Sequence, residues 1–436
     1  MDYDSYLPGK KCAMKQFAPV DWALDSNIYE VNVRQYTPEG TFRAFAEHLP
    51  RLRHMGIDIL WFMPITPISR KKRLGTLGSY YACADYVEIN PEYGTVEDFR
   101  WLVAEAHRQG FKVLIDWVAN HTGWDHVWTA THPEFYRKNI DGSFFDAHGW
   151  EDVIDLNYDS EELHDEMIRA MRFWVETCNI DGFRCDMAML VPLEFWREAR
   201  TRLDQIKPLF WLAECEEIMY HEVFDATYSW KWLHVMESFW KKSSDMQGLK
   251  QILYYYQHQF PHTALRSFFT SNHDENSHSG TEYERLGDAA LAFSVFCCLY
   301  DGLPLIYSGQ ELPARKRLLF FDKDEIPWKE PVELDRFYKT LLNLRKTNPA
   351  LKAGDQQRRA VLLSNTAPDQ ILSFLRRFEK DEVLVIINLS PDDKPVIITG
   401  QIHFGSYKNL FDPEGEQFIS GQPVHLRAWD FKVFVK

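Results

Sequence analysis

The chain has 436 residues, enough for a large core and for two or three domains or one barrel with an appendage. Its formal net charge is −15, and its Lys and Arg residues are scattered rather than clustered, which argues against a nucleic acid partner. No apolar run reaches the roughly 18 residues that a membrane span needs, so no membrane partner is expected either.

The start of the chain and its cysteines bear on the cellular compartment. The stretch MDYDSYLPGKKCAMKQ has no hydrophobic segment like that of a signal peptide, which predicts a cytoplasmic protein. A mature chain that had lost its signal peptide would look the same, so a secreted or periplasmic location stays open. The 7 cysteines lack the paired spacing of a zinc site or a disulfide framework, so reduced thiols are the simpler interpretation.

Residues 26–347 alternate short apolar, β-branched runs with longer segments of helical periodicity, the pattern of βα units around a parallel sheet. Eight runs have the character of buried strands, which is the number in a closed (β/α)8 TIM barrel. In chain order they are residues 27–35, 58–65, 112–117, 181–186, 209–214, 226–230, 266–272 and 304–309. Between them, helical patterns cover residues 41–56 and 95–110, the second with Thr95 as its N-cap and Gly110 at its end.

Two stretches depart from this alternation. Residues 121–160 follow the third strand, are rich in Trp, His, Asp and Gly, and are too long for an ordinary βα loop, so we expect a small excursion domain over the barrel mouth. In residues 351–436, short alternating strands separated by turn residues predict a C-terminal antiparallel β-sandwich domain. The predicted catalytic barrel then comprises residues 1–120 and 161–350.

Four acidic residues stand at or just beyond the carboxyl ends of predicted strands: Asp116, Asp186, Glu214 and Asp274. These strand ends share one rim of a barrel, and the active sites of such barrels lie at that rim. We therefore expect the four carboxylates to converge on one pocket.

The environments of two of these acids predict different protonation states. Arg184 and Asp186 are two residues apart in one strand and face the same side, so the guanidinium should keep Asp186 ionised with a lowered pKa. A purely structural Arg–Asp pair is the alternative. Glu214 ends the apolar run PLFWLAE, where desolvation should raise its pKa and suit it to general acid catalysis. One charged and one protonated carboxyl group is the arrangement that glycoside hydrolysis uses.

Two Asn-His pairs accompany the acids. His121 lies in DWVANHTG (116–123) and His273 in SNHDENS (271–277), and an imidazole at these positions can donate hydrogen bonds to sugar hydroxyls. The chain has no HExxH motif and no Gly-rich phosphate loop after a strand, so no nicotinamide, flavin or nucleotide cofactor is expected.

Four short stretches resemble, in order and spacing, the signature regions of the α-amylase family, glycoside hydrolase family 13. They are DWVANH (116–121), GFRCD (182–186), AE (213–214) in FWLAECEE, and FFTSNHD (268–274). The likeness extends over the whole predicted barrel. It implies a retaining double displacement on α-glucosidic bonds, most simply the α-1,4 bonds of starch-derived glucans or maltooligosaccharides.

The resemblance also implies roles for individual residues. Asp186 would be the nucleophile, Glu214 the acid/base, and Asp274 a third carboxylate that holds sugar hydroxyls. The substrate-binding residues would be Tyr81 under the reacting sugar, His121, Arg184, His273, and Asp116 holding Arg184. Asn120 corresponds to a residue that binds Ca2+ in many relatives, which implies a structural calcium ion; no organic cofactor is implied.

The sequence departs from the family pattern in ways that leave specificity open. After Asp186 it reads DMAML, with Met189 and Leu190 where typical endo-amylases have Lys-His, and QYTPEGTF (35–42) lacks the calcium loop of α-1,6-glucosidase relatives. The alternatives are an α-glucosidase or a glycosyl-transferring or isomerising relative acting on small α-glucosides, and a non-catalytic binding member of the fold. The presence of all three carboxylates argues against the last. The sequence does not indicate endo or exo action, or the oligomeric state.

Overall fold

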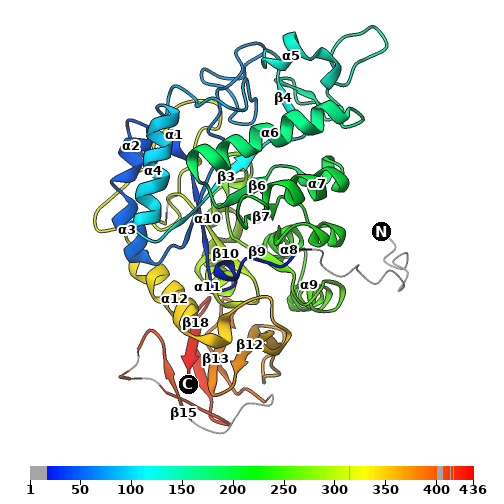
Figure 1. Cartoon of the computed structure of the whole chain (residues 1–436). Coiled ribbons are helices and arrows are strands. Elements are labelled where there is room, and N and C mark those ends of the chain that lie inside the picture. The colour runs from blue at the N-terminus through cyan, green and yellow to red at the C-terminus, as the bar shows by residue number, and fades with distance from the viewer. Residues whose placement is uncertain (1–16, 314, 400–405, 413, 416) are drawn as a thin grey trace.

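The computed structural model describes residues 17–313, 315–399, 406–412, 414–415 and 417–436. Eight parallel strands form a closed barrel in the order β1-β10-β9-β8-β7-β6-β3-β2 (Figure 1). They are β1 (Ile28–Val31), β2 (Ile59–Phe62), β3 (Lys112–Trp117), β6 (Gly182–Cys185), β7 (Phe210–Ala213), β8 (Ala226–Tyr228), β9 (Leu265–Phe268) and β10 (Leu303–Tyr307). Each overlaps one of the eight predicted runs, so the predicted TIM barrel is confirmed.

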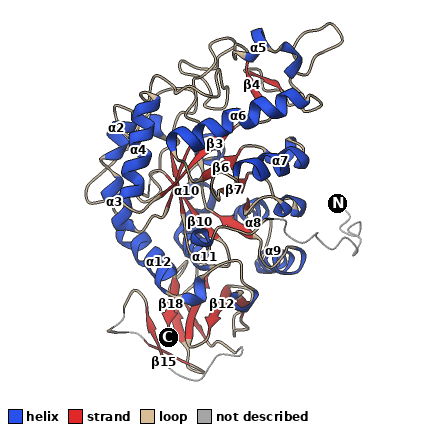
Figure 2. Ribbon diagram, viewed as in Figure 1, coloured by secondary structure: helices blue, strands red, loops and turns tan. Residues whose placement is uncertain are grey.

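Helices surround the barrel strands, as Figure 2 shows in blue around red. The described helices are α1 (Val33–Tyr36), α2 (Phe42–Ala46), α3 (Leu49–Met55), α4 (Val96–Arg108), α5 (Trp128–Thr131), α6 (Glu161–Cys178), α7 (Leu193–Leu203), α8 (Trp230–Trp240), α9 (Met246–Gln259), α10 (Glu282–Leu286), α11 (Ala290–Leu299) and α12 (Asp335–Thr347). Of these, α5 lies beyond the barrel rather than around it. The barrel strands carry almost fully buried side chains, as expected for a parallel sheet covered on its outer face by helices.

Local sequence signals explain where the early helices begin and end. Thr95 caps α4 in a capping box with Asp98, in which each side chain accepts a hydrogen bond from the other's backbone N–H. The predicted helix at 41–56 is two helices, because α2 ends at Ala46 and Pro50, which has no N–H to donate, stands in the first turn of α3.

The first predicted strand, residues 27–35, was too long. The strand ends at Val31, and Val33–Tyr36 form a helical turn. The side chains of Arg34 and Gln35 in this turn are buried and donate hydrogen bonds to backbone carbonyls of residues 78, 319, 320 and 322. The apolar character of the segment therefore reflects burial rather than extended structure.

Residues 121–160 contain a two-stranded antiparallel sheet of β4 (His121–Gly123) and β5 (Val153–Asp155), with α5 between them. In Figure 1 these elements lie at the top of the molecule, beyond the barrel. β4 continues directly from the segment after β3, so its first residue, His121, stays near the barrel mouth. The extent of this segment as a separate domain stays a prediction.

The chain ends in antiparallel β structure, as predicted. A six-stranded sheet has the order β11-β12-β13-β18-β15-β16, and a two-stranded sheet pairs β14 with β17. The strands are β11 (Val361–Leu362), β12 (Ile371–Phe378), β13 (Asp381–Asn388), β14 (Lys394–Val396), β15 (Ser406–Asn409), β16 (Gln417–Ile419), β17 (Val424–Leu426) and β18 (Phe431–Val435). Side chains from both sheets share one apolar cluster. The sequence analysis did not identify β15 and β16, which are only four and three residues long.

Helix α11 joins the barrel to the C-terminal sheet. Its sequence, ALAFSVFCCL, is apolar on all sides, which is typical of a helix with no exposed face. Phe296 of α11 packs against Phe374 of β12 with ring centroids 5.7 Å apart. The buried guanidinium of Arg376, also in β12, donates to the carbonyl of Tyr300 at 2.9 Å. The two parts therefore share a core.

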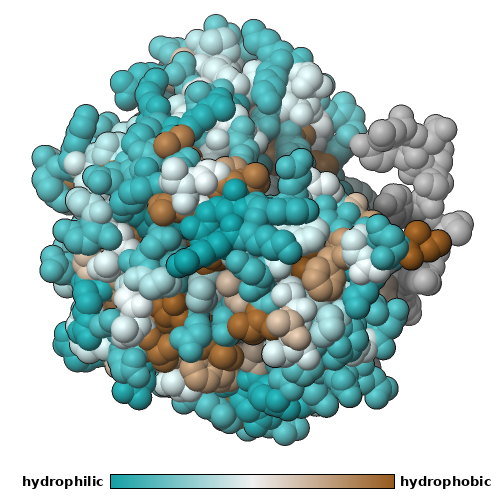
Figure 3. All heavy atoms as spheres, turned by 90° about the horizontal axis from the view of Figure 1, so that it is seen from above, coloured by the Kyte–Doolittle hydropathy of each residue, from teal (hydrophilic) through white to brown (hydrophobic). Residues whose placement is uncertain are grey.

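The surface seen from above in Figure 3 is mostly hydrophilic, with small separate hydrophobic patches. Such scattered patches are ordinary for a protein surface. None of the helices in the described part of the chain combines the length and apolarity required to cross a bilayer.

Candidate active site

Adjacent barrel strands bring the sequence-predicted acids together at their carboxyl ends. Asp116 in β3 pairs in register with Arg184 in β6. Asp186 and Glu214 directly follow β6 and β7, which pair through Cys185 and Ala213. Asp274 comes a few residues after β9.

The guanidinium of Arg184 is the centre of this group and has no exposed surface. Its Nη1 donates to Asp116 Oδ1 at 2.8 Å and to Asp186 Oδ1 at 2.9 Å, and its Nε donates to the Tyr228 hydroxyl at 3.2 Å. Its Nη2 lies 2.9 Å from Glu214 Oε2, an ion-pair contact without the angle of a hydrogen bond. One cation therefore contacts three carboxyl groups.

Asp116 is held on both oxygens and faces away from the pocket. Oδ1 accepts from Arg184, and Oδ2 accepts from Trp61 Nε1 at 3.2 Å and from the Tyr81 hydroxyl at 3.1 Å. With no exposed side-chain surface, Asp116 cannot touch a substrate directly. Its contacts instead fix the positions of Arg184 and Tyr81.

His273 links the acid after β9 to the strand β1. Its Nδ1 lies 2.5 Å from Glu30 Oε1, and its Nε2 lies 3.2 Å from Asp274 Oδ2 and 2.6 Å from the Tyr81 hydroxyl. Burial alone would lower the pKa of His273, but the charges of Asp274 and Glu30 outweigh it and hold the pKa well above its usual range. His273 is therefore an imidazolium at neutral pH.

Asp274 differs from the other acids because it faces the pocket, with 39% of its side chain exposed. Burial raises the pKa of Asp274, but the charge and hydrogen bond of His273, helped by the charge of Arg184, outweigh burial and lower the pKa to about 2. Asp274 is thus a permanent carboxylate that can accept hydrogen bonds from a ligand.

The site holds more carboxyl groups than its positive charges can neutralise. Five carboxyl groups share it with one guanidinium and one imidazolium: Glu30, Asp116, Asp186, Glu214 and Asp274. Burial raises the pKa of Glu214 to about 7, and Arg184 only partly offsets the burial and the charges of Asp186 and Asp274. Burial likewise raises the pKa of Asp116 to about 6. The site therefore retains a proton near neutral pH.

The expectation of a lowered pKa for Asp186 was wrong. Arg184 does favour its charged form, as predicted, but burial together with the charges of Asp116 and Asp274 outweighs that effect and raises the pKa of Asp186 to about 7. The sequence showed the arginine beside Asp186, but it could not show how many other acids that arginine has to neutralise.

The hydrogen bonds indicate which of the two acids holds the proton. Asp186 accepts a charged hydrogen bond from Arg184, which favours its ionised form. Glu214 Oε2 accepts its hydrogen bond from a neutral donor, the backbone N–H of Met187, at 2.8 Å. The arrangement therefore favours a carboxylate on Asp186 and a proton on Glu214.

The candidate site opens into a pocket of about 580 Å³, in the size range of pockets that hold a small organic ligand. Its wall includes Tyr81, His121, Asp186, Glu214 and Asp274, and also Leu74, Ser79, Trp150, Met187, His278, Phe320 and Phe321. Arg184, His273 and Asp116 lie behind this wall. The structure thus brings the predicted residues to one place, with three of the eight acting from behind.

His121 belongs to the part of the pocket wall that comes from the 121–160 segment. Burial lowers its pKa to about 4, so it is neutral and can accept as well as donate a hydrogen bond. Its ring is 5.3 Å from that of Trp150, which also lines the pocket. Of the three tryptophans in this segment, only Trp150 is among the residues that line the pocket.

Several site residues escaped the sequence analysis. Glu30 stands inside β1 as a single acid in an apolar run, and that isolation was the available signal for it. Trp61 and Tyr228 contact Asp116 and Arg184 but look like ordinary core aromatics in the sequence. Phe320 and Phe321 lie in a segment without regular periodicity.

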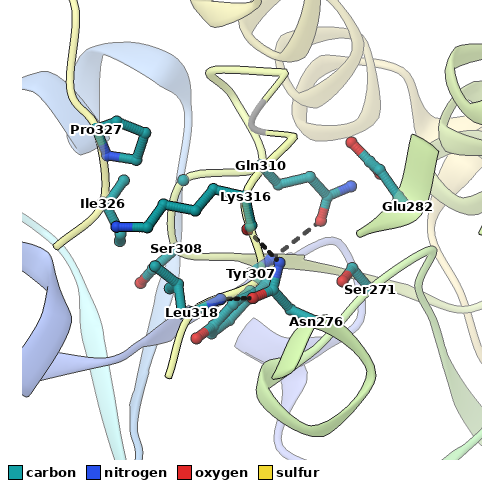
Figure 4. Close-up of a pocket in the computed structure, with 11 residues that line it drawn as sticks. Ser271, Asn276, Glu282, Tyr307, Ser308, Gln310, Lys316, Leu318, Ile326 and Pro327 are labelled. Atoms are coloured by element: carbon teal, nitrogen blue, oxygen red, sulfur yellow. Dashed lines mark hydrogen bonds between the residues drawn. The ribbon is translucent and has the colours of Figure 1, made fainter. Parts of the chain in front are cut away.

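A second, much smaller cavity of about 20 Å³ lies beside the carboxyl end of β10 (Figure 4). It has room for roughly one water molecule. Ser271, Asn276 and Gln310 are among its polar lining residues, while Leu318 and Ile326 close it on another side. It is separate from the group around Arg184.

The described residues show no metal site for the calcium ion that the resemblance implied at Asn120, so that ion stays a prediction. The Asn120 side-chain nitrogen lies 3.2 Å from His121 Nδ1, so its amide is engaged with a neighbouring ring. In the described ranges, no three His, Cys, Asp or Glu side chains are grouped so that they could hold a metal ion.

Comparisons with known proteins agree with the geometry. The model of the family described as "Alpha amylase, catalytic domain" matches residues 19–148 and 136–361, which include every acid discussed above. An alpha-amylase from Haloarcula japonica, MalA, is 28% identical over 401 residues; the match covers 86% of this chain and 57% of that protein.

Two solved structures resemble the chain over nearly all of its length. The crystal structure of an alpha-amylase from Lactobacillus plantarum is 29% identical, covers 96% of this chain and 100% of its own, and has a TM-score of 0.87. That of a noncanonic maltogenic alpha-amylase, AmyB, from Thermotoga neapolitana is 28% identical, with coverage of 95% and 99% and a TM-score of 0.87.

Proposed function

The chain belongs to the alpha-amylase catalytic-domain family, and from this premise we propose that it is a retaining glycoside hydrolase that cleaves α-1,4-glucosidic bonds in starch-derived glucans or maltooligosaccharides. The observation that carries the proposal is the contact of one guanidinium, Arg184, with both Asp186 and Glu214. This contact sets two buried carboxyl groups side by side at the mouth of the barrel, one favoured as an anion and the other as an acid.

In the first step, the Asp186 carboxylate attacks the anomeric carbon while Glu214 transfers its proton to the glycosidic oxygen. The bond from the anomeric carbon to that oxygen breaks, the shortened glucan leaves as an alcohol, and Asp186 becomes an ester of the sugar. Arg184 stabilises the carboxylate that forms on Glu214. Asp274 accepts hydrogen bonds from sugar hydroxyls as the ring distorts.

In the second step, a water molecule attacks the same carbon while the Glu214 carboxylate takes one of its protons. The ester bond to Asp186 breaks, which restores both carboxyl groups to their starting states. Two inversions leave the product in the α configuration. The neutral His121 and the Asp274 carboxylate supply hydrogen bonds to the sugar held in this position.

Proton NMR of the first anomer formed from maltoheptaose tests the proposal. We expect α-anomers to appear first and to mutarotate later, and we expect Asp186→Asn to lose nearly all of this activity. First-formed β-anomers, or an Asp186→Asn variant with wild-type rates, would contradict the mechanism. An added glucose acceptor distinguishes hydrolysis from transfer, because faster acceptor glucosylation than hydrolysis would support the transferring alternative.

A further inference from the structure

A segment far along the chain, residues 318–324, forms one wall of the pocket. Phe320 and Phe321 of this segment line the pocket beside Leu74 and Ser79, which belong to the loop after β2. We call residues 318–324 the 318–324 wall. Its contacts show that it is a fixed part of the site.

Hydrogen bonds hold the 318–324 wall against the loop after β2. The carbonyl of Phe321 accepts from the backbone N–H groups of Leu77 and Gly78 at 3.0 and 3.2 Å. Asp322 Oδ1 accepts from the backbone N–H and the hydroxyl of Thr76 at 2.8 and 2.6 Å. At Gly75 a Cβ would lie 2.5 Å from Phe321 Cβ, so the two segments are in close contact.

The helical turn α1 anchors the 318–324 wall from the barrel side. The amide of Gln35 donates to the carbonyls of Leu319 and Asp322, both at 2.8 Å, and accepts from the backbone N–H of Asp324 at 2.6 Å. Gln35 has no exposed surface. Moving this segment away would break these buried hydrogen bonds and leave polar groups without partners, which costs free energy.

Asn276 supports the 318–324 wall from beneath, beside the small cavity. Its Oδ1 accepts from the backbone N–H of Leu318 at 2.9 Å, and its Nδ2 donates to the carbonyl of Lys316 at 3.3 Å. Figure 4 shows this amide between the two residues. The wall is thus held by three separate elements.

The rings place this wall on the side of the pocket away from the proton donor. Phe320 is nearly parallel to Tyr81, with 10° between the planes and centroids 6.4 Å apart, and its centroid is 6.3 Å from that of His273. Glu214 instead lies against Met187. A general acid must stand beside the leaving group, so the side with Tyr81, His273 and Phe320 takes the sugar that forms the ester, the glycone.

We propose that the 318–324 wall closes the glycone side of the pocket, so that the enzyme cuts near non-reducing chain ends and releases glucose or maltose rather than cleaving within long chains. This inference rests on the proposed function. An open cleft would let a chain continue past the reacting sugar in both directions. Here Phe320 and Phe321 line the pocket, and Phe320 lies beside Tyr81 and His273 on the glycone side.

A pair of p-nitrophenyl maltoheptaosides tests the proposal, one with a free non-reducing end and one with that end capped by a 4,6-ethylidene group. Release of sugar products from each is followed by chromatography. We expect the capped substrate to be cleaved at least about tenfold more slowly, because the cap collides with the wall. Equal rates on the two substrates would overturn the inference but leave the hydrolase function intact, whereas cleavage of neither would contradict the proposed function itself.

Variants of the wall make the test specific. Phe321→Ala should raise the ratio of capped to uncapped rates by about tenfold. Asp322→Ala should also raise this ratio, because it removes the hydrogen bonds from Thr76 that hold the wall in place. Leu319→Ala is the matched control, since Leu319 lies in the same segment with its side chain 55% exposed and outside the pocket lining. If all three variants melt like the wild type and keep its ratio, the wall does not set the cleavage position.

Discussion

The carboxylate of Asp116 lies 2.8 Å from Nη1 of Arg184, and neither side chain has any surface exposed to solvent. Asp116 therefore fixes the guanidinium from behind, on the side opposite the pocket. The same guanidinium nitrogen contacts Asp186, so the position and the charge of Asp116 both reach the proposed nucleophile.

The first prediction concerns Asp116→Asn. The charge of Asp116 is one of the causes that raise the pKa of Asp186, so its removal should lower that pKa and move the acidic limb of the kcat/KM profile to lower pH. Loss of one hydrogen bond to a charged group should also reduce the maximum of kcat/KM by about 10- to 100-fold. Initial rates from pH 4 to 9 measure both effects.

A second buried ion pair provides the control for this experiment. Asp225 Oδ1 lies 3.1 Å from Nη2 of Arg200, and these side chains are 0% and 1% exposed, but the pair does not line the pocket. Asp225→Asn should lower stability in a similar way and leave the pH profile in place. If both variants shift the acidic limb equally, the link from Asp116 to Asp186 is disproved.

The second prediction assigns the proton donor. Glu214→Gln should slow hydrolysis of maltooligosaccharides by about 10²- to 10⁴-fold, because the leaving alcohol then departs unprotonated. With α-maltosyl fluoride, whose leaving group needs no proton, the first step should be nearly as fast as in the wild type. Rapid-quench measurement of fluoride release checks this. A variant with wild-type rates on maltooligosaccharides would remove Glu214 from the mechanism.

The third prediction is that the same substitution stabilises the protein at high pH. The pKa of Glu214 is raised from 4.5 to about 7 in the folded state, so its contribution to stability is full below pH 4.5 and is lost as the pH rises through 7. Glu214→Gln has no such loss. Its free energy of unfolding at pH 8 should exceed that of the wild type by about 1–3 kcal/mol, and the gain should vanish near pH 4, below the pKa of the unfolded state.

Urea denaturation at the two pH values measures this difference. Glu216→Gln serves as a comparison, because burial also raises the pKa of Glu216 but Lys231 and Tyr256 bind it outside the pocket. A Glu214→Gln variant that is less stable than the wild type at pH 8 would show that its contacts with Arg184 and Met187 outweigh the cost of burying its charge.

The barrel could be predicted from the sequence because each strand lies in a short, buried, mostly apolar run. Asp116, Asp186 and Glu214 end such runs, and closure of the barrel brings neighbouring runs together without further information. The C-terminal strands β15 and β16 escaped prediction because residues 406–409 and 417–419 have too little apolar alternation to stand out from turns.

The features of the site that could not be predicted from the sequence depend on contacts between distant segments. Glu30 reaches His273 across 243 positions, and Gln35 holds residues 319–324 across more than 280. Neither contact has a local pattern. The pKa of Asp186 was mispredicted for the same reason, since burial and the charges of Asp116 in β3 and Asp274 after β9 outweigh the effect of the arginine two residues away.

The fourth prediction concerns Glu30→Gln. Glu30 is one of the two acids that hold the pKa of His273 well above its usual range, so its loss should lower that pKa toward neutrality. Above the new pKa, His273 becomes neutral and no longer lowers the pKa of Asp274 or donates from both ring nitrogens. We therefore expect kcat/KM to fall at pH 8 much more than at pH 6.

Two-dimensional NMR of the imidazole carbons of labelled protein can follow the titration of His273 directly. In the wild type its signal should stay that of an imidazolium up to at least pH 8, and in Glu30→Gln it should titrate within the range studied. His164 offers an internal reference, because it is partly exposed and contacts Glu198 away from the pocket. A wild-type His273 that titrates near pH 6.5 would contradict the assigned charge.

The fifth prediction concerns the glycine that begins β6. A Cβ at Gly182 would lie 2.0 Å from the carbonyl oxygen of Phe210 in β7, and backbone atoms of a paired strand cannot move aside as a flexible side chain can. Gly182→Ala should therefore lower the free energy of unfolding by about 3 kcal/mol or more. Gly110→Ala is the control, since its nearest neighbour is Arg53 Nε at 4.0 Å and only its positive φ opposes a side chain. Because β6 and β7 carry Asp186 and Glu214 at their ends, the fraction of Gly182→Ala that folds should also lose activity. Gly110→Ala should keep its activity. A folded Gly182→Ala enzyme with normal kcat would mean that the spacing of these two strands tolerates more change than the Arg184 contacts suggest.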